Sequence, residues 1–116
     1  MRPKRNPEIV WRLEKGMHEM AWDKAHKGEE FEDLGVMTLM VDGTIHMLNL
    51  AGAEIWTRIN GIRSVETIAA EIASLFGADP GEMQADVMEF LNGVEGKGWV
   101  TLSGDSGPVA PRWTAK

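Results

Sequence analysis

The stretch VMTLMVDGTIHML, residues 36–48, decides the fold of this chain of 116 residues. Two apolar runs, residues 36–41 and 44–48, are separated by the pair Asp42-Gly43. Asp-Gly between two apolar runs favours a two-residue turn, because both positions of that turn take a positive φ that these residues tolerate. The stretch therefore predicts an antiparallel hairpin.

Helical spacing of apolar residues follows the hairpin. Asn49, Ser64 and Asp79 stand where their side chains can accept a hydrogen bond from the first turn of a helix, which makes them N-caps. The third start is the best defined, since Pro80 takes the first helical position and Glu82 completes the aspartate version of a capping box. These starts predict three helices, over residues 50–59, 65–76 and 80–95.

The rest of the chain carries weaker signals. Residues 7–13 hold β-branched and aromatic side chains behind a proline and predict a further strand. In the excursion at residues 14–34, apolar residues recur at helical spacing, so a packed helix and a mobile segment both remain open. The polar residues 1–6 and the Gly-, Pro- and Ser-rich residues 103–116 have little to bury. They predict a flexible N-terminus and a disordered tail around a domain over residues 7–102.

The order of these elements predicts an α+β protein. Three strands followed by three helices form a three-stranded antiparallel sheet with the helices packed on one of its faces. Three short helices joined by tight Gly-containing turns, together with a hairpin, are also typical of a winged helix-turn-helix protein. A chain of 116 residues has room for one such domain.

The charge of the chain argues against nucleic acid as a partner. Its 12 Lys and Arg against 18 Asp and Glu give a net charge of −6. The helix over residues 80–95, which would enter a DNA groove, carries acidic side chains and no basic one. Phosphate contacts supply most of the affinity for a duplex, so we expect no nucleic-acid partner. No apolar run reaches the ~18 residues of a membrane helix, so we expect no membrane partner either.

Residues that carry chemistry are sparse. The sequence holds no cysteine, which fits a reducing, cytoplasmic setting. His18, His26 and His46 show no metal-ligand spacing, and neither a carboxylate pair nor a Gly-rich phosphate loop suggests catalysis. We therefore expect no enzymatic activity, no metal site and no cofactor.

The block at residues 46–100 resembles the PqqD family, also described as the recognition element for precursors of ribosomally synthesised and post-translationally modified peptides (RiPPs). It reads HxLNxxGxxIW at residues 46–56, DVxxFL at residues 86–91 and KGWV at residues 97–100. The stretch NPEIVWR, residues 6–12, is similar to the opening strand of that family. Each piece alone is ordinary core spacing, but the set is specific.

The resemblance implies a non-catalytic peptide chaperone. Members of the family bind the leader of a precursor peptide by strand addition and present it to a radical-SAM maturase, typically one with a SPASM-type extension. The peptide-binding residues implied for this chain are Thr44, Ile45, His46, Met47 and Leu48 on an edge strand and Met83, Val87, Phe90, Leu91 and Val94 on the last helix. The long excursion at residues 14–34 points to a related RiPP system rather than to pyrroloquinoline quinone (PQQ) itself.

The physical properties of an edge strand also support the hypothesis of a peptide chaperone. An edge strand exposes backbone N–H and C=O groups to which an extended peptide can pair. Apolar residues at helical spacing are more often core, so we expect about half of the implied helix residues to be buried, and Ile55 and Trp56 to be core residues. The alternative hypothesis is a structural module in which the same edge or cleft forms a homodimer and binds no peptide.

Overall fold

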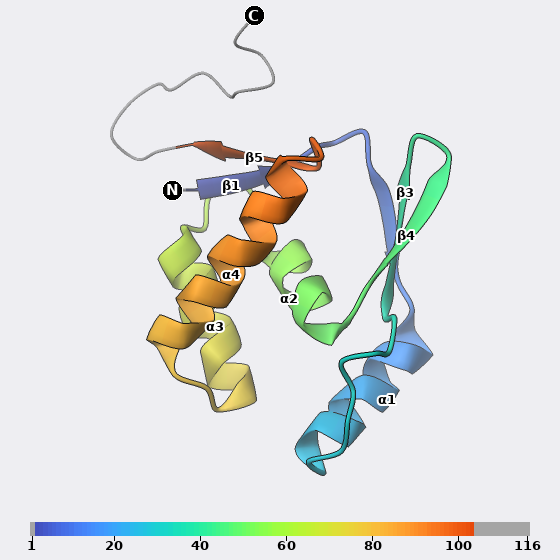
Figure 1. Ribbon diagram of the computed structural model, residues 1–116, viewed down its shortest axis with the longest axis vertical. Helices are drawn as coiled ribbons and strands as arrows, with labels where there is room; N and C mark the ends of the chain where they lie inside the picture. Colours follow the sequence, from blue (N-terminus) through green and yellow to red (C-terminus); the bar gives the residue numbers. More distant parts are fainter. Residues whose placement is uncertain (1, 104–116) are drawn as a thin grey trace, which may run out of the picture. The chain divides into compact units, whose positions relative to one another are not determined.

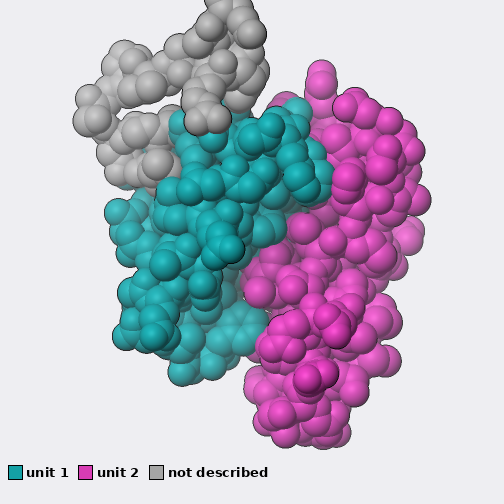
Figure 2. Space-filling view, viewed as in Figure 1, with its two compact units in different colours: residues 1–6, 55–116 teal, residues 7–54 magenta. Residues whose placement is uncertain are grey.

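The computed structural model describes residues 2–103 (Figure 1). The elements follow the order β1 (Arg2–Arg5), β2 (Val10–Leu13), α1 (Lys15–His26), β3 (Met37–Val41), β4 (Thr44–Leu48), α2 (Leu50–Arg58), α3 (Val65–Phe76), α4 (Pro80–Glu95) and β5 (Val100–Ser103). They divide into two compact units, which Figure 2 colours separately. Of the described residues, unit 1 holds 2–6 and 55–103, and unit 2 holds 7–54. Each unit has a sheet of its own.

The sheet of unit 2 is antiparallel and has the strand order β2-β3-β4. The turn between β3 and β4 is the predicted one, with φ of 50° at Asp42 and 80° at Gly43. Both values lie in the left-handed region that a two-residue hairpin requires. The hairpin and the α+β class with a three-stranded antiparallel sheet are therefore confirmed.

This sheet has one buried and one open face. Met37 and Leu39 on β3 have no exposed surface, and they define the inner face. Met40 and Ile45 pair with each other across β3 and β4, and both are exposed. Because successive side chains of a strand point to opposite faces, Met40 and Ile45 lie on the other side of the sheet, the outer face.

The excursion contains a helix, α1, which resolves the alternative that the sequence left open. Three side chains of unit 2 tie it to the first half of α2. His18 Nε2 lies 2.9 Å from Glu54 Oε2, and Trp22 Nε1 donates to the same oxygen at 3.2 Å. The Trp22 ring also stacks on His26 at a centroid distance of 5.4 Å. The helix is therefore held by polar and aromatic contacts as well as by its one fully buried residue, Ala21.

In unit 1, β1 pairs with β5 along its full length, so the prediction of a flexible N-terminus is wrong for the residues that the structure describes. Pro3 is buried, and its carbonyl accepts a hydrogen bond from Gly61 N at 2.8 Å. Arg5 donates to the Trp56 carbonyl at 2.9 Å, and burial lowers the pKa of its guanidinium. β5 ends at Ser103, and the rest of the predicted tail, residues 104–116, lies outside the described residues.

The predicted helix starts are confirmed. Asn49 Oδ1 accepts from Gly52 N at 3.0 Å, Ser64 Oγ from Thr67 N at 3.1 Å and Asp79 Oδ2 from Glu82 N at 3.0 Å. Each bond satisfies one of the N–H groups that a helix leaves unpaired at its first turn. Trp56 and Ile55 belong to the buried core, as expected.

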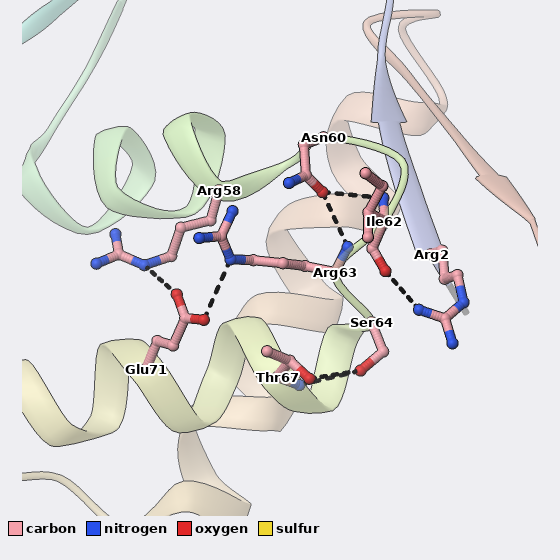
Figure 3. Close-up of polar contacts among 8 residues, drawn as sticks. All are labelled: Arg2, Arg58, Asn60, Ile62, Arg63, Ser64, Thr67 and Glu71. Atoms are coloured by element: carbon pink, nitrogen blue, oxygen red, sulfur yellow. Dashed lines mark hydrogen bonds and ion pairs between the residues drawn. The ribbon is translucent and has the colours of Figure 1, made fainter.

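Polar contacts fix the turn between α2 and α3 in unit 1 (Figure 3). Asn60 Oδ1 accepts from the backbone N of Ile62 at 2.9 Å and of Arg63 at 2.8 Å. Glu71 receives Arg58 Nε on one carboxylate oxygen and Arg63 Nε on the other, each at 3.1 Å. The turn is thereby pinned to α3 from both sides.

Candidate functional site

The candidate site begins with β4, the last strand of the sheet of unit 2. Within residues 2–103, β4 pairs with β3 and with no other strand. A strand at the end of a sheet offers its second side to another chain. The edge strand that the family resemblance implied at Thr44–Leu48 is therefore the last strand of this sheet.

Hairpin geometry determines which backbone groups of β4 lie at this edge. In a two-residue hairpin the pair next to the turn, here Val41 and Thr44, exchanges both N–H···O bonds, and every second pair after it does the same. Ile45 and Met47 belong to the pairs in between. Their N–H and C=O groups therefore point away from β3, toward the side where a further strand would add.

The side chains of β4 alternate between the two faces. His46 pairs with Leu39 and Leu48 pairs with Met37, so both lie on the inner face, where they are half-buried. Ile45 and Met47 lie on the outer face and are exposed. The edge thus combines outward backbone groups with exposed apolar side chains at the same two residues.

Gly35 makes room for one of these side chains. A Cβ at position 35 would lie 2.7 Å from Met47 Cε and 3.3 Å from Met47 Cβ. Since real Cβ atoms do not approach other atoms so closely, any larger residue at position 35 would displace the Met47 side chain. The loop before β3 and the edge strand are therefore packed together in unit 2.

The predicted helix residues lie on α4 in unit 1, which packs on α3. Val87, Leu91 and Val94 are buried, whereas Met83 and Phe90 are only partly buried. The expectation that about half of this set is core is confirmed. The edge residues and the α4 residues belong to different compact units.

Sequence reasoning missed a groove on the outer face of unit 2. It has a volume of about 330 Å³ and is lined by Val10, Trp11, Arg12, Thr38, Met40 and Ile45. The strands carry apolar side chains at nearly every position, so the sequence pattern alone does not mark Val10 and Met40 as groove residues. Alternation along residues 36–48 puts Met40 and Leu39 on opposite faces of the strand, but it does not tell which of the two faces is buried.

Metal-ligating side chains are dispersed over the described residues. Within residues 2–103, His, Asp and Glu side chains nowhere gather in a group of three that could hold a metal ion. Over the same residues, every helix is too short or too polar to cross a membrane. His18 pairs with Glu54 at 2.9 Å, and this contact helps to hold α1 against the first half of α2.

Fold and edge define a small α+β protein of the winged helix-turn-helix type, with a three-stranded antiparallel sheet that ends in an open strand. The sequence profile of the family described as "Coenzyme PQQ synthesis protein D (PqqD)" matches residues 33–100, which is more than half of the chain. The chain belongs to the PqqD family. No curated protein matches it in sequence.

A solved structure has the same fold. It is the solution NMR structure of the PqqD truncation of Methylobacterium extorquens PqqCD, which its authors describe as a functional and stand-alone RiPP recognition element. The two share 16% sequence identity at a TM-score of 0.60, over 86% of this chain and 88% of the other. At this identity the likeness concerns the fold, which is kept although most side chains differ.

Proposed function

We propose that this protein is a non-catalytic recognition element that binds the leader of a ribosomally synthesised precursor peptide along β4 and presents it to a radical-SAM maturase in the cytoplasm. Membership of the PqqD family supports the class of function. The observation that carries the binding mode is the pair Ile45 and Met47, whose backbone groups point outward at an open edge and whose side chains are exposed.

Binding of the peptide as an added strand would account for both the affinity and the selectivity of the protein. Main-chain hydrogen bonds along β4 tolerate many peptide sequences, while pockets for alternate side chains give selectivity. Met83 and Phe90 on α4 of unit 1 are partly accessible and are proposed as further peptide-binding residues. Flexible methionine side chains suit a surface that must accept varied residues, and the chain has eight methionines.

Isothermal titration of the full-length protein with synthetic leader peptides, taken from short reading frames found next to its gene, tests the proposal. We expect saturable heat of binding. The informative pair of variants is Met47→Pro and Met47→Ala. Both lose the methionine side chain, but only the proline lacks the outward N–H, and neither removes a β3–β4 hydrogen bond. Because one main-chain bond contributes ~1 kcal/mol, the proline variant should bind about fivefold more weakly than the alanine variant.

Circular dichroism melting of both variants provides the control for folding. Equal affinities of the two variants would rule out pairing along β4, and absence of heat with or without the maturase would overturn the proposed function. Size-exclusion chromatography with and without peptide addresses the homodimer alternative. A dimer that persists in the presence of peptide would favour the homodimer hypothesis, since the β4 edges of the two copies would then pair with each other.

A further inference from the structure

The outer face of the sheet in unit 2 carries a row of exposed apolar side chains. Val10, Met40 and Ile45 stand in register across β2, β3 and β4, and they are 70%, 42% and 62% exposed. Met47, two residues further along β4 on the same face, is 55% exposed. Contiguous apolar surface of this kind on a small protein marks a site of interaction.

The groove of about 330 Å³ lies along this row. Val10, Arg12, Thr38, Met40 and Ile45, which line it, all share the outer face by strand register. The Arg12 guanidinium pairs with Glu14 at 3.0 Å, so its charge is compensated from within unit 2. The groove is therefore mainly apolar and suits an aliphatic or aromatic side chain rather than a charged one.

We infer that the outer face reads alternate side chains of the peptide strand on β4, and that it selects peptides with large apolar residues two positions apart. This inference rests on the proposed function and deepens it. A strand that pairs with the outward backbone groups of Ile45 and Met47 places its own residues beside them. Those two peptide residues, i and i+2, share the face of Ile45 and Met47 whichever direction the peptide runs.

Continuity of the surface favours the peptide over a separate protein as the occupant. Ile45 and Met47 supply both the backbone groups that would pair and the side chains that would be covered. The row Val10–Met40–Ile45 ends at the edge strand, so the next side chain in the row is that of the added strand. A long side chain there, such as Leu, Met or Phe, extends over Ile45 toward Met40 and the groove.

Selection from a displayed library of random 12-residue peptides on the immobilised full-length protein tests this inference. The wild type should enrich peptides with apolar residues at i and i+2. The test variant is Ile45→Thr, which keeps a β-branched side chain and the backbone but removes apolar surface. Its matched control is Ile62→Thr, the same change at a residue of unit 1 that is 72% exposed.

Fluorescence polarisation with the best enriched peptide then gives the affinities. Ile45→Thr should weaken binding about tenfold, as expected for one aliphatic contact, and Ile62→Thr should leave it unchanged. Replacing the peptide residue at i by serine should cost about tenfold against the wild type and much less against Ile45→Thr, because the two partners are coupled.

The outcomes distinguish peptide binding along β4 from the selection of peptide side chains by the outer face. Enriched peptides that bind Ile45→Thr as tightly as the wild type, or that show no preference at i and i+2, would overturn the role of the outer face and leave peptide binding standing. In that case a separate protein is the occupant of the face. No enrichment on the wild type would overturn peptide binding and, with it, this inference.

Discussion

Trp56 is fully buried, yet its indole Nε1 has no hydrogen-bond partner among the described residues. A buried donor that is left unpaired costs ~1–3 kcal/mol, while the ring itself contributes packing. The neighbouring backbone is engaged, since the Trp56 carbonyl accepts from Arg5. The Trp56 side chain therefore stabilises the fold through the packing of its ring and destabilises it through its unpaired N–H.

For this reason we expect Trp56→Phe to be tolerated. The loss of ring volume is partly offset by removal of the unpaired N–H, so the free energy of unfolding should fall by less than ~2 kcal/mol. Trp56→Ala loses the whole ring and should cost ~3–5 kcal/mol. Urea unfolding of both variants measures the difference, and similar losses would mean that the buried N–H carries no penalty.

At the scale of elements, the turn between β3 and β4 depends on backbone conformation alone. Gly43 has a φ of 80°, and no atom lies within 4 Å of the position that a Cβ would take. A side chain at position 43 would therefore meet no steric clash with the rest of the protein. Its only cost in stability would be the strain of the left-handed backbone conformation. Gly93 on α4 has the same open surroundings, but its conformation is helical.

The same substitution should then act in opposite directions at these two glycines. Gly43→Ala should lower the free energy of unfolding by ~1–2 kcal/mol because alanine is strained at this φ. Gly93→Ala should raise it by ~0.5–1 kcal/mol because alanine favours a helix. Thermal melts of both variants give the two signs. Destabilisation of equal size at both positions would contradict a purely conformational cost.

Across the whole molecule, the termini of the described chain meet in one sheet. β1 pairs residue by residue with β5, from Arg2 with Ser103 to Arg5 with Val100. Asn6 N extends the ladder by donating to the Trp99 carbonyl at 2.8 Å. The stability of unit 1 thus depends on contacts between the two ends of the chain.

Deletion of residues 2–5 should therefore destabilise the protein although the segment is short and basic. Loss of about three ladder hydrogen bonds at ~1 kcal/mol each, together with the buried Pro3, predicts a fall of ~2–4 kcal/mol in the free energy of unfolding. Lys4→Ala, which keeps the strand, is the control and should have little effect. Unfolding curves that do not shift on deletion would show that β1 contributes nothing.

Local sequence determined the parts of this protein that form from neighbouring residues. Asp42-Gly43 sets the hairpin, and Asn49, Ser64 and Asp79 set the starts of three helices, because a turn or a cap needs only residues within a few positions. The family resemblance implied that Thr44–Leu48 is an edge strand, and the strand order β2-β3-β4 shows that it is one. Each of these features was predicted.

Tertiary structure alone decided the rest. Arg2–Arg5 becomes a strand only because β5, about a hundred residues away in the chain, lies beside it. Met40 and Leu39 are equally apolar in the sequence, and only the packing of the sheet buries one and exposes the other. Pairing partners and covered faces are properties of distant segments, so no local pattern in the sequence could show that the outer face of the sheet stays open.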